Sequence, residues 1–326
     1  MGKIRWGVAG PGIIARKFAE AVGNLSDVEL SGVASNSKAR AEKFAEEFSV
    51  PNVFSSYEEM AESPLIDAVY VSTAHPFHKP AAEIFIKSGK AVLCEKPMCV
   101  NSDEAKKLIS LAKEKGVFLM EAMWTRFLPF IKELRSIMAS GEIGKPMSLT
   151  ADFCYSIERE EDPKLFENSL AGGSLLDVGV YALHFADMVF EDVPEKIFAV
   201  ANVEDGVDYH TQILLGYKEG KTAALSSAIK LQKPFDAYIY GTEGSIRIPD
   251  FYMADRFTIQ KDGKERIIEC PYSGNGFEGE ILEVCRCMGE GRLESDINPH
   301  SKSVFVLEQM DKIRKQIGVS YICDKK

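Results

Sequence analysis

The chain has 326 residues, of which 45% are hydrophobic and 27% are charged, and its formal net charge at pH 7 is -10. The length predicts about two domains, because single hydrophobic cores rarely grow beyond roughly 250 to 300 residues, and the composition is typical of a soluble globular protein. The negative charge, without a basic stripe anywhere in the sequence, excludes nucleic acid as a partner.

We find no targeting or membrane segment. The N-terminal residues MGKIRW pass directly into a strand-like run, which leaves no room for a signal peptide, and Trp6 does not fit the myristoylation pattern. Apolar runs fall short of the roughly 18 residues that span a bilayer. The seven cysteines are scattered and odd in number, which favours free thiols in a reducing compartment. We therefore expect a cytoplasmic protein that does not bind a membrane.

Short β-rich runs and helical patterns alternate up to about residue 121. Strands that alternate with amphipathic helices predict βαβ units and a parallel sheet with helices on both faces. In chain order the predicted elements are strand 4–9, helix 13–22, strand 29–34, helix 38–48, strand 68–72, helix 80–87, strand 91–94, helix 103–115 and strand 118–121.

The pattern changes after a helical stretch at 128–139, which Gly141 and Gly144 end. Several β-rich runs follow, joined by tight turns, and this spacing predicts a mainly antiparallel sheet. We place the domain boundary near 122–126, without a flexible linker. The predicted elements beyond it are helix 175–190, strands 195–204, 209–217, 221–230, 236–240 and 256–269, and helices 277–289 and 302–317.

A glycine pattern, Gly10-x-Gly12-x-x-Ala15, lies within GVAGPGIIA, between the first predicted strand and the first predicted helix. The first glycine permits a tight turn, the second lets the backbone approach a pyrophosphate, and the small third residue lets helix and strand pack closely. The N–H groups at the start of the helix, around Ile13 and Ile14, would then face the phosphates. We interpret the pattern as a dinucleotide site rather than an ordinary glycine turn.

The second predicted strand ends in Ser35, Asn36 and Ser37, about where an acidic residue would bind the ribose 2′-hydroxyl in an NAD site. No carboxylate occurs in this segment. Small polar side chains, a helix start and the basic residues Lys38 and Arg40 could instead hold a 2′-phosphate, which favours NADP over NAD. The alternative is that Lys38 and Arg40 are solvated helix residues.

Two further segments follow predicted parallel strands and therefore lie at the sheet edge where α/β proteins bind ligands. Thr73, His75 and His78 follow the third strand, and Glu95 and Lys96 follow the fourth. A lysine at this edge can exchange a proton when partial burial and a positively charged cofactor ring favour its neutral form. Taken alone, Glu95 and Lys96 are better explained as a solvated ion pair.

With these motifs in this order, the chain resembles the Gfo/Idh/MocA family of NAD(P)-dependent oxidoreductases. The resemblance covers essentially the whole chain and rests on GVAGPG at 7–12, EKP at 95–97 and GGSLLDVGVY at 172–181. Within that family, EAMWTRF at 121–127 and DVGVYALH at 177–184 resemble the branch of dimeric trans-dihydrodiol dehydrogenases and NADP-dependent D-xylose 1-dehydrogenases.

The resemblance implies a fold with two domains of the α/β class. Residues 1–122 would form a Rossmann domain that binds NAD(P). Residues 123–326 would form an α+β domain for substrate binding and dimerisation, with a large, mainly antiparallel open sheet that offers a face for a homodimer.

The resemblance also assigns the chemistry: Lys96 matches the catalytic lysine, Asp177 its acidic partner and Tyr181 the tyrosine of this branch. Asp177 and Tyr181 are four residues apart on a predicted helix, so both can face the same side. A phenol beside a lysine ammonium is stabilised as a phenolate, and Tyr181 could then exchange the substrate hydroxyl proton. The alternative is a half-buried packing tyrosine.

Two segments depart from the family pattern. The family's Thr-Pro-x-x-x-His segment reads TAHPFH at 73–78, so its first proline is absent, and the glycine triplet ends in Ser174. The first departure concerns the contact with nicotinamide and the second the entry to the helix. The family also implies a cis peptide bond between Lys96 and Pro97.

Other clusters are weaker candidates. His75 and His78 could bind a metal together with Cys285 and Cys287, but these cysteines lie in a distant predicted helix without a second spaced pair, so we expect no metal. Aromatic and polar residues near the domain junction could contact substrate or simply form core. These candidate substrate residues are Trp124, Arg126, Phe127, Phe153 and His184.

We therefore predict an NADP-dependent oxidoreductase that transfers a hydride between the nicotinamide and a CH–OH carbon of a sugar or cyclic diol. The alternative is a nucleotide-binding sensor of the same fold that has lost turnover. The presence of Lys96, Asp177 and Tyr181 argues for the enzyme.

Overall fold

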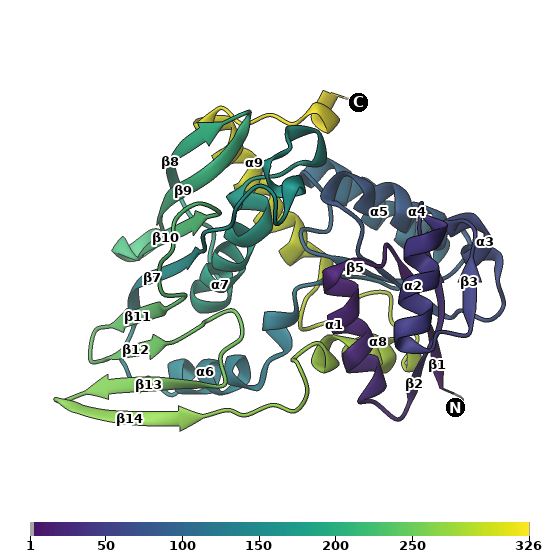
Figure 1. The fold of residues 1–326 in the computed structure, drawn as a ribbon. Coiled ribbons are helices and arrows are strands. Elements are labelled where there is room, and N and C mark those ends of the chain that lie inside the picture. The colour runs from purple at the N-terminus through teal and green to yellow at the C-terminus, as the bar shows by residue number, and fades with distance from the viewer. Residues whose placement is uncertain (1–2, 326) are drawn as a thin grey trace. The chain divides into compact units, whose positions relative to one another are not determined.

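The computed structural model describes residues 3–325, which form two compact units (Figure 1). Unit 1 comprises the chain up to Phe127 and the segment Ser273–Val304. Unit 2 comprises Leu128–Tyr272 and the chain from Phe305 onward. The sequence predicted a boundary near 122–126, but it did not predict that the chain returns to unit 1 at Ser273–Val304.

Unit 1 contains a six-stranded parallel sheet in the order β3-β2-β1-β4-β5-β6, as the alternating pattern predicts. The strand order reverses between β1 and β4, and ligands of open α/β sheets bind at such a point, beyond the carboxyl ends of the strands. The strands are β1 (Ile4–Ala9), β2 (Val28–Ala34), β3 (Asn52–Phe54), β4 (Ala68–Val71), β5 (Ala91–Glu95) and β6 (Leu119–Ala122).

Helices cover both faces of this sheet (Figure 1). Helix α5 shows how the sequence sets its own ends: the Asn101 side chain accepts a hydrogen bond from the Glu104 N–H at 2.9 Å, and Gly116 ends the helix with φ +65°. The short elements β3 and α3 were not predicted, because so few residues show no periodicity. The helices are α1 (Ile13–Gly23), α2 (Lys38–Phe48), α3 (Tyr57–Glu62), α4 (His78–Lys87), α5 (Ser102–Lys115) and α8 (Glu278–Gly289).

The returning segment seals the edge of the sheet at β6. The Leu119 N–H donates to the carbonyl of Leu293 at 3.1 Å, and the Leu119 carbonyl lies 2.8 Å from Nε2 of His300. The Asn298 side-chain amide donates to the carbonyl of Glu121 at 3.0 Å. An exposed edge strand can pair with other chains. By covering β6, the returning segment prevents such pairing.

Unit 2 contains an eight-stranded sheet in the order β14-β13-β12-β11-β7-β10-β9-β8. Only the pair β7 and β10 is parallel within this described sheet, so the prediction of a mainly antiparallel sheet is confirmed. The strands are β7 (Pro146–Cys154), β8 (Lys196–Glu204), β9 (Val207–Gly216), β10 (Thr222–Ala228), β11 (Ala237–Gly241), β12 (Ser245–Ile248), β13 (Arg256–Lys261) and β14 (Lys264–Glu269).

Three strand assignments made from the sequence were wrong or incomplete. The run 256–269 is a hairpin, not one strand: Asp262 and Gly263 have φ of 52° and 69°, the conformation that an Asp-Gly hairpin turn requires. Strand β12 and the central strand β7 were not predicted. In β7 the outward Ser148, Thr150 and Asp152 alternate with inward apolar residues, which is the pattern of a half-buried strand, so β7 could have been predicted.

The helices of unit 2 are α6 (Pro129–Ala139), α7 (Val180–Phe190) and most of α9 (His300–Ile317). A π-helical turn, η5 (Leu175–Gly179), precedes α7, so the predicted helix 175–190 begins with an irregular turn. Turns of this kind are frequent at functional sites.

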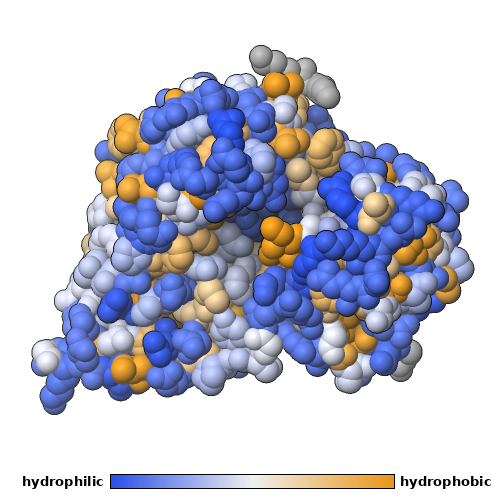
Figure 2. Space-filling model, viewed as in Figure 1, coloured by the Kyte–Doolittle hydropathy of each residue, from blue (hydrophilic) through white to orange (hydrophobic). Residues whose placement is uncertain are grey.

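The segment Asn168–Phe190 is long and apolar enough to cross a membrane by length and composition, but 94% of its apolar window is buried. Such burial is typical of a core helix. The face shown in Figure 2 is mainly hydrophilic, with apolar side chains in small scattered groups. One strand, β8, leaves Phe198 and Val200 61% and 70% exposed, and the homodimer expected through this sheet stays a prediction.

A buried carboxylate, Asp208, fixes the start of η5. Its Oδ2 accepts hydrogen bonds from the Ser174 hydroxyl at 2.7 Å, the Leu175 N–H at 2.8 Å and the Thr211 hydroxyl at 2.7 Å. A Cβ on Gly173 would lie 2.3 Å from Oδ1, and the φ of Gly173 is +105°, so only glycine fits beside the carboxylate. The third glycine of the family triplet is Ser174 here, and its hydroxyl forms one of these bonds.

Burial raises the pKa of Asp208 from 3.8 to about 6. A raised pKa in the folded state contributes stability below pH 3.8, and this contribution is lost as the pH rises through about 6. Oδ1 has no hydrogen-bond partner among the described residues, so a proton can reside there without disturbing the three bonds to Oδ2.

We predict that Asp208→Ala lowers the free energy of unfolding by about 2 to 4 kcal/mol, because buried donors lose their acceptor. Asp208→Asn keeps a carbonyl oxygen for them and should cost less than half as much. Urea unfolding at pH 5 and pH 7 tests both effects: the Asn variant should also lose the decrease in stability between these pH values. Equal stability of the two variants would contradict this role of Asp208.

Candidate functional site

The loops after β1 and β4 approach each other at Gly10. Its φ is +90°, and a Cβ there would lie 3.0 Å from both the Ser72 carbonyl oxygen and the Thr73 side chain. Glycine is therefore needed for two reasons, backbone conformation and close approach. The contact closes the sheet edge at the point where the strand order reverses.

The start of α1 is open, as a pyrophosphate site requires. Gly12 is the N-cap residue and supplies no side chain to the first N–H groups of the helix. A Cβ on Gly12 would meet no atom closer than 4.0 Å, and the following Ile13 is 76% exposed. The unsatisfied N–H groups around Ile13 and Ile14, together with the helix dipole, can bind an anionic group.

The residues predicted for the 2′-phosphate lie at the end of β2 and the start of α2. The Ser35 hydroxyl accepts from the Ser37 N–H at 3.2 Å, and the Arg40 guanidinium donates to Asn36. Lys38 instead extends into solvent, with its side chain 81% exposed and 3.5 Å from Glu42. Arg40 and Asn36 are therefore joined at the end of β2, whereas Lys38 takes no part in this contact.

A buried histidine links the loops after β4 and β5. Nδ1 of His78 lies 2.8 Å from the Pro97 carbonyl oxygen, and Nε2 lies 2.9 Å from that of Thr73. Carbonyls only accept, so both contacts are hydrogen bonds when the ring carries two protons. Burial opposes that charge and lowers the pKa of His78. The neutral ring still ties the two loops when its proton is on Nδ1, which then donates to Pro97. The centroid of the His75 ring lies 5.7 Å from that of His78.

Glu95 is the last residue of β5, Lys96 and Pro97 follow it, and the peptide bond between Lys96 and Pro97 is cis, as the resemblance implies. Glu95 is buried and accepts hydrogen bonds from the Tyr70 hydroxyl and, at 3.1 Å, from the Lys96 N–H. Burial raises the pKa of Glu95, while the nearby charge of Lys96 lowers it. Half-buried Lys96 is thus part of a built cluster and not a solvated ion pair.

Two further buried carboxyl groups surround this turn and were not predicted. Glu121 accepts from the Met98 N–H at 2.9 Å and from the Ser303 hydroxyl at 2.6 Å, which fixes the chain after Pro97. Glu280 on α8 is fully buried without a hydrogen-bond partner among the described residues. Burial and the neighbouring Glu95 raise the pKa of Glu280 well above its ordinary value.

Aromatic residues near the end of unit 1 stack on each other. Trp124 and Phe277 have ring centroids 5.3 Å apart, and both are largely buried. Arg126 is buried, and Phe127 is half-buried in the same 3₁₀ turn, η2 (Trp124–Phe127). The candidate substrate residues of unit 1 thus lie together, joined by Phe277.

In unit 2, η5 and α7 carry the second group of predicted residues. The Tyr155 hydroxyl donates to Oδ2 of Asp177 at 2.6 Å. One turn further on, Tyr181 is 8% exposed, and its ring centroid lies 5.3 Å from that of Phe153 and 6.0 Å from that of Tyr252. Asp177 and Tyr181 therefore face a common surface of aromatic side chains, whereas His184 is fully buried in the helix core.

Several residues of this surface were missed from the sequence: Tyr155, Phe235 and Tyr252. Phe153 contacts Phe235 and Tyr252 at centroid distances of 5.1 Å and 4.3 Å. Tyr155 could have been found, because it continues the alternation of Phe153 on one face of a strand. The other two lie in connecting segments without periodicity.

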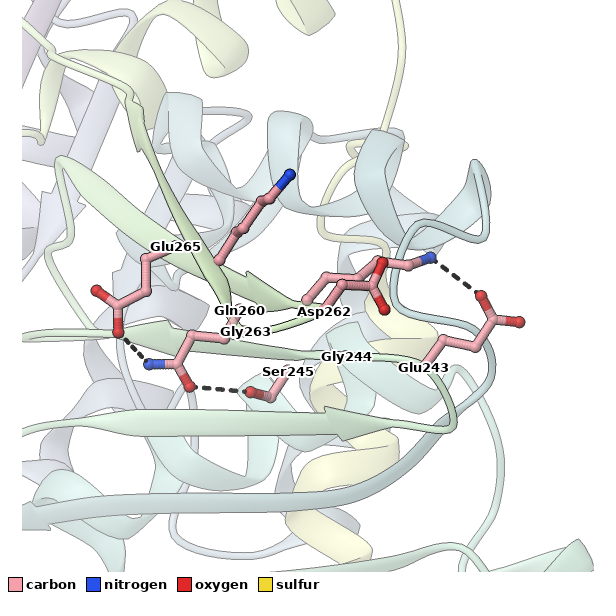
Figure 3. Close-up of a pocket in the computed structure, with 9 residues that line it drawn as sticks. Glu243, Gly244, Ser245, Gln260, Asp262, Gly263 and Glu265 are labelled. Atoms are coloured by element: carbon pink, nitrogen blue, oxygen red, sulfur yellow. Dashed lines mark hydrogen bonds and ion pairs between the residues drawn. The ribbon is translucent and has the colours of Figure 1, made fainter.

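Two other kinds of site can be assessed among the described residues, a metal site and a polar hollow. In residues 3–325, no group of three or more His, Cys, Asp and Glu side chains could hold a metal ion. Figure 3 shows a hollow at the turns of the unit 2 sheet, where Lys261 lies 3.0 Å from Glu243 and the Gln260 amide donates to Glu265 at 2.8 Å. Several of its polar groups bond to each other, and it contains none of the predicted site residues.

Comparison with known families matches both units. Residues 4–123 match the Gfo/Idh/MocA oxidoreductase family with an NAD-binding Rossmann fold, and residues 131–247 match a Gfo/Idh/MocA C-terminal domain. Trans-1,2-dihydrobenzene-1,2-diol dehydrogenase of Mus musculus is 35% identical over 333 residues, covering 99% of both chains. The enzyme of the same name from Homo sapiens is 33% identical over 334 residues, also covering 99% of both.

Solved structures share the fold at lower identity. A 3-ketoreductase from Actinomadura kijaniata in complex with NADP and TDP-benzene has a TM-score of 0.89 and 24% identity, covering 97% of this chain and 98% of its own. An aldose-aldose oxidoreductase from Caulobacter crescentus complexed with glycerol has a TM-score of 0.87 and 22% identity, covering 96% and 97%. The matches to both domains and the full-length relatives show that the chain belongs to the Gfo/Idh/MocA family and is an NAD(P)-dependent dehydrogenase.

Proposed function

We propose that this chain is an NADP-dependent dehydrogenase that acts on a CH–OH carbon of a sugar or a cyclic diol. The observation that carries the proposal is Lys96, half-buried beside Glu95 at the carboxyl end of β5. This is the sheet edge that holds the dinucleotide in related folds. The diol dehydrogenases among the relatives and the sugar oxidoreductase among the similar structures support this substrate class.

In the proposed reaction, which follows the family resemblance, Lys96 and Tyr181 are the residues that act on the substrate hydroxyl. When bound, the nicotinamide accepts the hydride from the substrate carbon or returns it. Tyr181 as phenolate takes the hydroxyl proton in the oxidation, and the ammonium of Lys96 stabilises that phenolate. Asp177 orients the pair. Of these three residues only Tyr181 takes a proton, and the reaction is balanced: the substrate carbon loses a hydride, and its oxygen loses a proton to Tyr181.

NADP rather than NAD is supported by the residues at the end of β2. Arg40 and Asn36 are hydrogen-bonded there, and no carboxylate is placed to repel a 2′-phosphate in the segment 35–40. Burial raises the pKa of Tyr57, and the charge of Arg40 lowers it. Tyr57 therefore lies close to the guanidinium of Arg40. NADP is also the nucleotide bound to the 3-ketoreductase of similar fold.

The first experiment is a panel of pentoses, hexoses, inositols and trans-dihydrodiols, tested with NADP and NAD by the absorbance of the reduced nicotinamide. We expect turnover with at least one sugar or dihydrodiol, and a higher kcat/KM with NADP. Silence across the panel, together with measurable binding of NADPH, would contradict the proposal and favour a non-catalytic sensor of the same fold.

Lys96→Met should lower kcat by at least about 100-fold, because the variant loses the group that supports proton transfer. Binding of NADPH, followed by its fluorescence, should persist, since the glycine turn is untouched. The control is Lys87→Met on the exposed end of α4, which should retain normal turnover. Nearly unchanged turnover of a folded Lys96→Met protein would show that Lys96 is not catalytic.

Arg40→Ala should raise KM for NADP about tenfold or more and leave KM for NAD nearly unchanged, because a charge-assisted hydrogen bond to the 2′-phosphate is lost. Lys43→Ala, an exposed residue of the same helix, is the matched control. Steady-state kinetics with both cofactors measures the effect. A parallel increase in both KM values would argue against a 2′-phosphate contact.

A further inference from the structure

Tyr155 directly follows strand β7, and its hydroxyl donates a hydrogen bond to the Asp177 carboxylate at 2.6 Å. Phe153 and Tyr155 are two residues apart and lie on the same face of the extended chain. Asp177 and Tyr181 are four residues apart on the turn and helix that pack on this face. Two residues of a strand span about 6.6 Å and one helical turn about 5.4 Å, so the two pairs meet in register.

The contacts follow this register. Phe153 lies against Tyr181, with ring centroids 5.3 Å apart, and Tyr155 reaches Asp177. Phe153 and Tyr155 also contact each other, at 6.5 Å between centroids. Phe153 thus packs its apolar ring against Tyr181, and Tyr155 donates its hydroxyl to Asp177.

The backbone on either side of Tyr155 is fixed by hydrogen bonds. Its N–H donates to the Ala228 carbonyl at 3.1 Å, and the Ile157 N–H donates to that of Ile229 at 3.1 Å. The Cys154 carbonyl accepts from the Lys233 N–H at 3.0 Å. The chain therefore continues alongside β10 beyond the end of β7, and the hydroxyl is held by a rigid support.

The charges around Tyr155 keep it a donor. Burial and the neighbouring carboxylate of Asp177 raise the pKa of Tyr155 far above its ordinary value, so the phenol stays protonated at neutral pH. Burial raises the pKa of Asp162, the other acid near Tyr155. The nearby Asp177 raises it as well, because the two carboxyl groups repel each other. Lys164, 3.5 Å from Asp162, offsets that repulsion. The phenol favours Asp177 as the ionised member of this pair.

The other end of the turn is fixed independently. Asp208 accepts from the Ser174 hydroxyl and the Leu175 N–H, which sets the start of η5 two residues before Asp177. The backbone of Asp177 is thus placed by Asp208, while its carboxylate is placed by Tyr155.

We infer that Tyr155 is a positioning residue of the active site, which fixes the carboxylate of Asp177 in the orientation that supports Tyr181. The inference rests on the proposed function, because it gives Tyr155 no contact with substrate or cofactor. Tyr155 acts only through Asp177. Its hydroxyl neither moves a proton nor forms a bond in the reaction.

Tyr155→Phe removes one oxygen atom and keeps the ring. We expect kcat to fall about 10- to 100-fold, with KM for NADP unchanged, because a hydrogen bond to a charged group is lost. The acid limb of the pH profile of kcat should shift to higher pH by about one unit, because Asp177 becomes easier to protonate. A merely structural tyrosine would not move this limb.

Two controls make the result specific. Tyr217→Phe changes another buried tyrosine of unit 2, which packs on Phe190 at 4.8 Å, and should behave as wild type. In an Asp177→Asn background, Tyr155→Phe should have little further effect on kcat, since its route of action is already removed. Urea unfolding of each variant verifies that it is folded.

The results of these experiments distinguish the role of Tyr155 from the role of Asp177 in the proposed function. If Asp177→Asn impairs turnover but folded Tyr155→Phe keeps the kcat and pH profile of wild type, the inference is overturned and the proposed function stands. Additive losses in the double variant would likewise overturn it, because Tyr155 would then act by another route. If Asp177→Asn retains full turnover, the role of Asp177 in the proposed function has failed.

Discussion

The parallel sheet of unit 1 is the constraint on which the cofactor half of the site depends. All its strands end at one edge, so Gly10, Thr73 and Lys96 lie at the same edge although they are far apart in the sequence. His78 then ties the loop after β4 to the turn after β5. Buried glutamates around Lys96 add hydrogen bonds that hold this turn in place.

In unit 2, two polar side chains, Asp177 and Tyr181, lie on a mainly apolar turn and helix. Asp208 binds the N–H groups and hydroxyls at the start of η5, and Tyr155 binds the carboxylate of Asp177. Buried polar groups of this kind are costly unless they are satisfied. Their presence beneath Tyr181 is explained by the need to hold a reactive group in one orientation.

The sequence alone predicted much of this arrangement and missed the rest for definable reasons. Glycines, the strand ends and the EKP turn leave local signals, so the fold class and the parallel sheet of unit 1 could be predicted and candidate site residues could be named. The interactions of Asp208, Glu121 and Tyr155 join residues distant in the chain, and a single buried polar residue creates no periodicity. Strand β7 was missed although its polar and apolar residues alternate, and the hairpin of β13 and β14 was missed because its Asp-Gly turn was not recognised.

The central claim is that a hydride passes from a CH–OH carbon to the nicotinamide while the residues of the chain move only protons. Its most direct test is to incubate the protein with NADP and either D-xylose deuterated at C1 or a trans-dihydrodiol deuterated at both carbinol carbons. NMR then determines the hydrogen isotope at C4 of the reduced nicotinamide. We predict deuterium at C4 with at least one of these substrates. NADPH that carries only protium at C4, or no reduction with either substrate, would contradict the account.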